Sequence, residues 1–181
     1  VQHSIVACGE DACDPHNEGR GPLKIDCSII IDMFPRDLTS RYFADITRTI
    51  VKGRASDELR RMYDAVLAGQ ECAFRLIRGG GDGEAIHREV HGTMEAHGFK
   101  TGEINGRMQG FFHGTGHGLG LEVHEPPRIS KVKTALRAGN VVTVEPGLYY
   151  PGVGGVRIED VVLVTETGCQ NLTTLPKKLE V

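Results

Sequence analysis

The sequence predicts an α+β fold with two similar halves, and three observations support this prediction. Stretches rich in Ile, Val and Thr, as strands are, lie on both sides of a central segment with helical periodicity. The two strand-rich parts also repeat a spacing of apolar and acidic residues. Finally, 181 residues are enough for one domain with a substantial core, and too few for two full domains. We therefore treat residues 1–181 as a single domain.

The first strand-rich part is a predicted hairpin. Residues 23–33 (LKIDCSIIIDM) and 43–52 (FADITRTIVK) have strand composition, and the turn-prone segment FPRDLTSR lies between them. Two such runs with a turn between them are expected to pair antiparallel.

A helical hairpin is predicted next. From Ser56 to Ile77 apolar residues recur at helical spacing, and Ser56 is a suitable N-cap residue. Glycines 79–81 end this helix, and Asp82 caps a second helix that closes at Gly98.

Three further strands are predicted after the hairpin, at residues 110–124, 140–145 and 155–165. Proline has no N–H for a central ladder, so the prolines between these segments suit bends rather than central strands. They are Pro126, Pro127, Pro146 and Pro151.

The halves repeat one another weakly. Leu23 precedes Asp32 by nine residues, and Leu136 precedes Glu145 by nine. A second acid follows each of these acids by 13 or 14 residues, namely Asp45 and Glu159. The repeat suggests a pseudo-twofold with four carboxylates meeting at its axis. A helical hairpin that matches residues 56–98 is then expected upstream of Val1, so the chain is expected to be a fragment.

Composition excludes several classes of partner. The formal net charge is −3 and no basic cluster is concentrated, so we expect no nucleic-acid partner and no membrane partner. No apolar run is long enough to span a bilayer. The five cysteines are scattered, without a CxxC pair, which is typical of reduced thiols and predicts a cytoplasmic location.

The acids suggest a metal centre. Four carboxylates brought together repel unless they bind cations or share protons, and these four lie in apolar strand segments rather than in polar loops. His117 is the natural fifth ligand. Oxygen-rich sites with one imidazole suit Mn, Co, Fe or Zn, with a preference here for Mn or Co. Two such ions, about 3.5 to 4 Å apart, would convert a bridging water into hydroxide near neutral pH, which predicts a hydrolase.

Two sequence motifs and the segments around Asp32 and Asp45 resemble a known peptidase family. HGTGHGLGLEVHEPP (113–127) and VVTVEPGLYYPGVGGVRIED (141–160), preceded by Asp32 and by YFADITRT around Asp45, closely resemble the catalytic domain of one peptidase family. This family contains Xaa-Pro aminopeptidase, Xaa-Pro dipeptidase (prolidase), methionine aminopeptidase and creatinase, and GGVRIED is similar to its proline-peptidase branch. The resemblance implies the pita-bread fold, in which curved antiparallel sheet forms pseudo-twofold halves with helices on the outer face.

It also implies roles for individual residues. Asp32 would chelate one metal ion, His117 and Glu145 the other, while Asp45 and Glu159 bridge the two. The nucleophile would be a metal-bridging hydroxide, and Glu145 the general base. The expected substrate is a peptide with proline in second position, cut before the proline. The substrate side of the site would be formed by His16, His113, His124 and Arg157.

The roles on the substrate side differ in kind. His124 and His113 are also expected to take part in catalysis beside Glu145. His124 would hydrogen-bond the scissile carbonyl, and His113 would line the pocket beside the scissile bond. Arg157, two residues before Glu159, could orient that carboxylate. Such a protein is expected to form a homodimer at full length and to have a further domain upstream.

Alternatives stay open beside this hypothesis. The chain could be a peptidase-like binding module for peptides or proteins, or a family hydrolase with another substrate. HREVH (87–91) has metal-binding spacing, but a solvated helix face is the better interpretation. Phe34 stands where the family usually has a small residue, so the wall near Asp32 is expected to differ.

Overall fold

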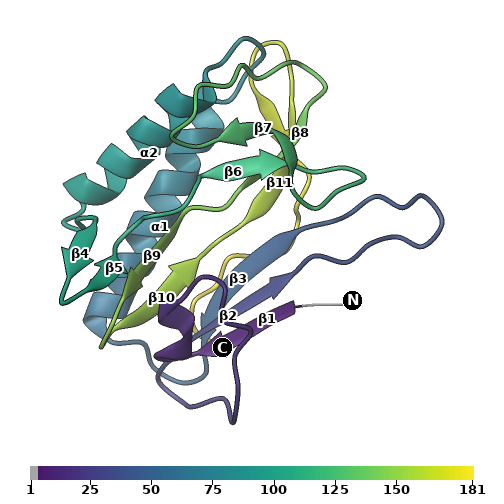
Figure 1. Ribbon diagram of the computed structural model, residues 1–181. Helices are drawn as coiled ribbons and strands as arrows, with labels where there is room; N and C mark the ends of the chain where they lie inside the picture. Colours follow the sequence, from purple (N-terminus) through teal and green to yellow (C-terminus); the bar gives the residue numbers. More distant parts are fainter. Residues whose placement is uncertain (1–3) are drawn as a thin grey trace.

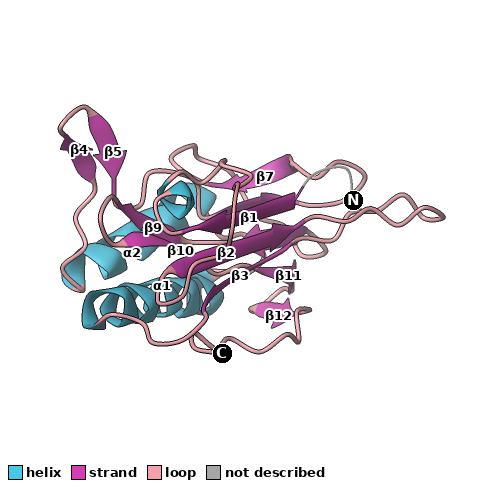
Figure 2. Ribbon diagram, turned by 90° about the horizontal axis from the view of Figure 1, so that it is seen from below, coloured by secondary structure: helices cyan, strands magenta, loops and turns pink. Residues whose placement is uncertain are grey.

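The structure is a computed structural model that describes residues 4–181. Two antiparallel helices lie on one side of the molecule, and short antiparallel sheets form the other side (Figure 1). Figure 2, seen from below, shows both helices together on one face of the strands. Within residues 4–181, no helix combines the length and apolar character that crossing a membrane requires.

The first sheet has the order β1-β2-β3, with β1 at Ser4–Cys8, β2 at Ser28–Met33 and β3 at Ile46–Val51. All its pairs are antiparallel, and Asp32 lies opposite Thr47. The predicted hairpin is therefore confirmed, but its first strand begins five residues later than expected. Leu23 is 51% exposed, whereas its proposed counterpart Leu136 is 1% exposed, so the repeat does not extend to these two leucines.

The second sheet has the order β12-β11-β8-β6-β7. Its strands are β6 (Gly116–Gly118), β7 (Glu125–Ile129), β8 (Val141–Val144), β11 (Asp160–Val164) and β12 (Cys169–Asn171). The long strand expected at 110–124 is thus reduced to the three residues of β6. Two further pairs complete the strands: β4 (Gly102–Ile104) with β5 (Arg107–Gln109), and β9 (Gly147–Tyr150) with β10 (Gly154–Arg157).

Two strand boundaries differ from the expected ones, although none of the four prolines lies in a central strand. Pro126 and Pro127 lie inside β7, which is an edge strand, and both fall in a bulge between the pairs His117↔Arg128 and Gly118↔Glu125. A missing N–H costs no ladder bond there. The predicted strand 155–165 is interrupted at residues 158–159, and its two parts, β10 and β11, belong to different sheets.

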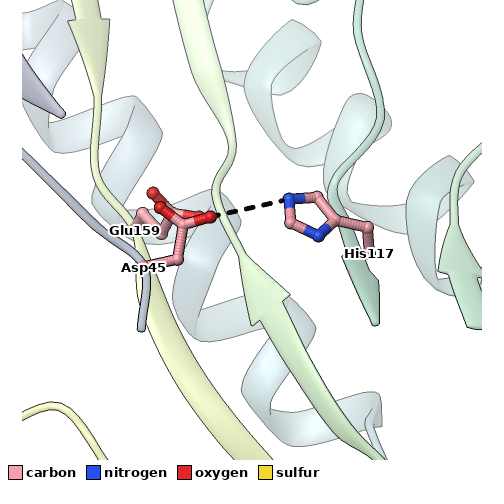
Figure 3. Close-up of side chains that lie close together, drawn as sticks. All are labelled: Asp45, His117 and Glu159. Atoms are coloured by element: carbon pink, nitrogen blue, oxygen red, sulfur yellow. Dashed lines mark ion pairs between the residues drawn. The ribbon is translucent and has the colours of Figure 1, made fainter. Parts of the chain in front are cut away.

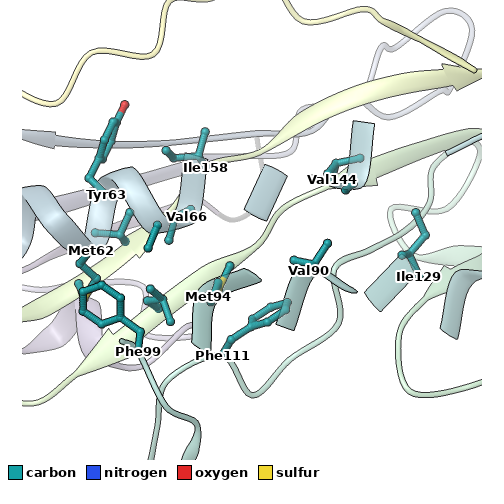
Figure 4. Close-up of a cluster of buried hydrophobic side chains, with 14 of the residues drawn as sticks. Met62, Tyr63, Val66, Val90, Met94, Phe99, Phe111, Ile129, Val144 and Ile158 are labelled. Atoms are coloured by element: carbon teal, nitrogen blue, oxygen red, sulfur yellow. The ribbon is translucent and has the colours of Figure 1, made fainter. Parts of the chain in front are cut away.

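The helices follow the predicted caps closely. α1 spans Asp57–Leu76 and the Ser56 side chain accepts a hydrogen bond from the Leu59 amide, while α2 spans Gly83–Ala96 with Asp82 as N-cap. Their apolar faces enclose one core with the second sheet, as Figure 4 shows for Val66, Val90, Val144 and other residues. This core lies beneath the strand ends that carry the acids.

Candidate metal centre

The four predicted acids lie where strands of the two sheets begin or end. Asp32 lies near the end of β2, and Asp45 directly precedes β3. Glu145 directly follows β8, and Glu159 directly precedes β11. Each antiparallel pair therefore delivers two carboxylates to one end, and these ends face each other across the two halves.

His117 completes the cluster from β6. Its Nδ1 lies 3.0 Å from the carbonyl oxygen of Gly118, which makes Nδ1–H the donor and turns Nε2 toward the acids. Nε2 is 3.1 Å from Glu145 Oε1 and 3.9 Å from Asp45 Oδ2. Asp45, His117 and Glu159 each offer a ligand atom, all within 4.8 Å of one another (Figure 3). A bulge between His117 and Gly118 aims this ring, since bulges redirect side chains.

The glycines around His117 allow neighbouring backbone to approach closely. A Cβ on Gly116 would lie 1.9 Å from the carbonyl oxygen of Thr143, and one on Gly118 would lie 2.4 Å from that of Pro126. No larger residue fits between β7 and β8 at these two positions. The alternating glycines therefore serve strand packing and hold the His117 backbone in place.

The carboxylates repel one another strongly in this protein. Burial, with the neighbouring charges of Asp32 and Glu145, raises the pKa of Asp45 to about 7. Burial and the charges of Glu145, Asp45 and Asp32 raise the pKa of Glu159 well above its ordinary value. Burial also raises the pKa of Asp32, against the opposing influence of Arg157. Such carboxylates need a cation or shared protons.

Glu145 and His117 form the exception. Burial alone would raise the pKa of Glu145, but its hydrogen bond to His117 and the charge of that ring outweigh burial and lower it to about 2. Burial likewise opposes protonation of His117, yet Glu145 raises its pKa overall. Without a cation, the imidazole itself neutralises one carboxylate.

The donor set fits divalent metal ions. Asp32 Oδ1 is buried and has no hydrogen-bond partner, which is costly for a carboxylate oxygen unless a ligand completes it. Four carboxylates and one imidazole converge, and no cysteine lies among the cavity-lining residues. This combination suits Mn, Co, Fe or Zn in catalytic sites rather than a structural zinc site.

Arg157 has a different partner from the one expected. Its Nη2 donates to Asp32 Oδ2 at 2.6 Å, and not to Glu159. Glu159 Oε2 instead accepts from Thr47 Oγ1 at 2.7 Å. β10 and β11 separate between Arg157 and Glu159, so these residues do not share a strand face as the uninterrupted strand required.

Tyr149 is a site residue that sequence reasoning missed. Its hydroxyl accepts from Arg157 Nη1 at 2.9 Å and lies 2.8 Å from His113 Nε2, to which it can donate. Burial raises the pKa of Tyr149 to about 12, so the hydroxyl keeps its proton. The only signal in the sequence was an aromatic pair four residues after Glu145, which is also typical of an ordinary core strand.

His113 is neutral and held on both sides. Its Nδ1 lies 2.8 Å from the Gly114 carbonyl, so Nδ1–H donates there and Nε2 accepts from Tyr149. Burial lowers the pKa of His113 to about 4. Both ring nitrogens are therefore occupied, and the ring can offer substrate only its surface.

All nine predicted site residues line one cavity of about 640 Å³. His16 and His124 are exposed at its margin, and the His124 ring packs edge-on against His117 at 4.4 Å between centroids. Phe34 also lines the cavity, together with apolar side chains from β1 and several loops: Ile5, Pro15, Val123 and Val132. The cavity lining thus combines the acids with apolar side chains, and the apolar side chains can contact a nonpolar group of a ligand.

His87, in contrast, was placed wrongly. It is 4% exposed rather than solvated, and its Nδ1 lies 2.9 Å from the Thr115 hydroxyl. Thr115 in turn accepts a backbone hydrogen bond from Glu145 through its carbonyl. His87 therefore supports the site from behind.

Comparisons with known proteins identify relatives that match nearly the whole chain. The model of metallopeptidase family M24 matches residues 2–166. The Xaa-Pro dipeptidase of Pyrococcus furiosus is 37% identical over 183 residues, which is 97% of this chain and 48% of that protein. The chain therefore spans about half the length of the curated relatives it matches.

Solved structures give the same picture. The X-Pro aminopeptidase of Thermotoga maritima superposes with a TM-score of 0.88 at 36% identity, covering 98% of this chain and 49% of that one. The structure of Escherichia coli aminopeptidase P in complex with substrate superposes with a TM-score of 0.81 at 32% identity. The match covers 97% of this chain and 45% of that one.

Fold and site together define a protein of the metallopeptidase class with the pita-bread fold. The chain belongs to metallopeptidase family M24.

Proposed function

We propose that this chain forms the catalytic part of a metallopeptidase that cleaves the bond between an N-terminal residue and proline. The observation that carries the proposal is the convergence of Asp32, Asp45, His117, Glu145 and Glu159 in one cavity, with a buried carboxylate oxygen that lacks a partner. The relatives named as Xaa-Pro dipeptidase and X-Pro aminopeptidase support the substrate class. The apolar part of the cavity suits a proline ring.

Two divalent metal ions would be held by these five residues, with Mn proposed and Co, Zn or Fe as alternatives. Asp32 would chelate one ion, His117 and Glu145 the other, and Asp45 and Glu159 would bridge them. Bound ions would supply Lewis acidity and lower the pKa of water. The raised pKa values of Asp45 and Glu159 support this assignment, because a cation relieves the repulsion that raises them.

The chain's own residues would handle the proton and the substrate. The Glu145 carboxylate lines the cavity and is 19% exposed, so it could accept a proton from water and pass it to the leaving amine. Burial and the charge of His117 lower the pKa of His124, so that its neutral ring can donate one N–H to the scissile carbonyl. His16 would grip the substrate at the margin, and His113 would shape the wall.

Arg157 and Tyr149 would position the site rather than react. Arg157 holds Asp32 by one nitrogen and Tyr149 by another. Tyr149 carries this support on to His113. A series of hydrogen bonds through Asp32, Arg157, Tyr149 and His113 would therefore link the metal-binding side of the cavity to its substrate side.

The test is metal-dependent release of the N-terminal residue by the full-length protein. We expect hydrolysis of Xaa-Pro dipeptides or of longer Xaa-Pro peptides with Mn²⁺, and none after chelation. Asp45→Ala should lower kcat by more than about 100-fold, because it removes a direct ligand and loss of indirect support alone costs about 10- to 100-fold. His97→Ala, an exposed position on the far end of α2, is the matched control and should keep full activity.

If metal-loaded protein cleaves no Xaa-Pro peptide of any length but still binds such peptides, the alternative of a peptidase-like binding module replaces this proposal. Cleavage of other peptides with equal efficiency would instead favour a family hydrolase with another substrate.

We further propose a cytoplasmic location and a homodimer at full length. All five cysteines are free thiols in the structure, which supports a reducing compartment. The homodimer is supported only by the resemblance, and light scattering of the full-length protein tests it.

A further inference from the structure

Gln70 is a fully buried polar side chain that the proposed function does not use. It lies on the inner face of α1 with 0% exposure, among apolar residues such as Val66 and Ala73. An amide in such a place is costly unless it is hydrogen-bonded. Its partners therefore indicate why an amide occupies a core position.

The partners are two backbone carbonyls of the second sheet. Gln70 Nε2 donates to Val144 O at 2.9 Å and to Ile158 O at 3.2 Å. These two residues directly precede Glu145 and Glu159. One side-chain nitrogen thus uses its two hydrogens to hold the chain just ahead of two proposed metal ligands.

The position of this contact is significant. The β8–β11 ladder ends at the pair Val144↔Asp160, and beyond it Glu145 and Glu159 leave the paired region. Just beyond this pair one long backbone bond, Ile158 N to Pro146 O at 3.4 Å, still joins the two chains. The Gln70 amide adds a second bridge between the two chains at this point. Val66, Val144 and Ile158 belong to the hydrophobic core that Figure 4 shows.

We propose that Gln70 is a positioning residue that sets the separation of Glu145 and Glu159 from beneath. The proposal rests on the proposed metal centre and adds to it a residue of the helical layer. Gln70 does not reach the cavity, since it is absent from the lining residues, and it acts through the backbone of the two ligands.

The amide orientation follows from the partners. Two carbonyl oxygens can only accept, so the nitrogen must face them, and Oε1 is left buried without a partner. An unpaired buried oxygen is a cost that a leucine or methionine would avoid. The same substitution would also take the donor from the Val144 and Ile158 carbonyls, so the experiment must separate a positioning role from a contribution to stability.

The experiment compares Gln70→Leu with Val66→Ala in the full-length protein. Gln70→Leu keeps a similar volume and removes both donors. Val66→Ala, one turn earlier on the same face of α1, damages the same core without touching either carbonyl. Mn²⁺ affinity is measured by calorimetry, thermal stability is measured in EDTA, and kcat and KM are measured separately.

Removal of such indirect support for ligands weakens metal binding or activity by about 10- to 100-fold. We expect this loss for Gln70→Leu in Mn²⁺ affinity and kcat, with KM for the peptide unchanged. Val66→Ala should lower thermal stability and leave Mn²⁺ affinity as in the wild type. Gln70→Asn keeps an amide too short to reach both carbonyls, and it should show the same loss if Gln70→Leu does not fold.

Wild-type Mn²⁺ affinity in Gln70→Leu, or in Gln70→Asn where only that variant folds, would overturn the proposal. So would an equal loss of affinity in Val66→Ala, since stability alone would then explain it. Calorimetry needs no substrate, so a wild-type protein that binds Mn²⁺ without cleaving Xaa-Pro peptides contradicts the proposed function and leaves this test intact.

Discussion

At the scale of one residue, Asp45 shows how burial and neighbouring carboxylates raise a pKa in this site. It is 7% exposed and lies within reach of His117 and Glu159. Its pKa rises from 3.8 to about 7. The folded metal-free protein therefore holds a proton there that the unfolded chain releases at much lower pH.

This difference gives a pH dependence with a definite sign. Because the folded state binds more protons than the unfolded state between pH 4 and 7, the contribution of Asp45 to stability is present below pH 4 and is lost as pH rises to about 7. The expected loss in the free energy of unfolding is roughly 4 kcal/mol between pH 4 and pH 7. Urea unfolding of the EDTA-treated protein across this range measures it.

Asp45→Asn is the control that isolates this residue. His87 and His113, whose pKa values fall to about 4, change stability in the opposite direction over a similar range, but both proteins contain them. The free energy of unfolding of wild type should therefore fall relative to that of Asp45→Asn as pH rises from 4 to 7. A difference that stays constant from pH 4 to 7 contradicts the raised pKa.

At the scale of the element, β6 depends on two glycines. Gly116→Ala would place a Cβ 1.9 Å from the Thr143 carbonyl oxygen and force β6 away from β8. Since His117 follows directly, the imidazole would move with the strand. We expect a loss of about 3 kcal/mol or more in unfolding free energy, together with loss of Mn²⁺ binding.

Gly92→Ala is the matched substitution. Gly92 lies inside α2, is exposed, and has open space around its Cα. Alanine there should stabilise the protein by about 0.5 to 1 kcal/mol. Both variants are compared by thermal unfolding with and without Mn²⁺. Equal behaviour of the two would show that β6 tolerates a side chain, against the structure.

The same elements show what sequence can predict here. The ends of α1 and α2 were predicted because a Ser56 or Asp82 cap and the apolar spacing are local signals. The acids and His117 were found because each occurs in a motif. Arg157 was given the wrong partner because the break between β10 and β11 depends on which sheet each half joins.

His87 and Gln70 were beyond local signals for a related reason. A histidine or a glutamine at a helical position is polar in any pattern, and only the packed structure shows which one faces the core. Their partners, the Thr115 hydroxyl and the Val144 carbonyl, come from strands far along the chain. Tertiary contacts of this kind leave no periodic trace in the sequence.

At the scale of the whole molecule, the site lies between the two halves. Asp32 and Asp45 come from the part that contains β1, β2 and β3, whereas His117, Glu145 and Glu159 come from the second sheet and its connections. Direct bonds already cross this boundary, including Thr47 to Glu159 and Arg48 to Asp160. A bound cation would join the halves again at the same place.

Metal binding should therefore protect both sheets at once. A ligand that binds only the folded state stabilises it by about 2.7 kcal/mol at 100 times its Kd, which slows amide exchange through unfolding by about 100-fold. We expect Mn²⁺ to slow hydrogen exchange by similar factors in β2 and β8, which supply ligands from opposite halves. Hydrogen exchange with mass spectrometry, in EDTA and in excess Mn²⁺, measures this. Asp45→Asn should abolish most of the Mn²⁺-dependent protection in both strands. Protection confined to one sheet would mean that the ligands of the other half do not bind the ion.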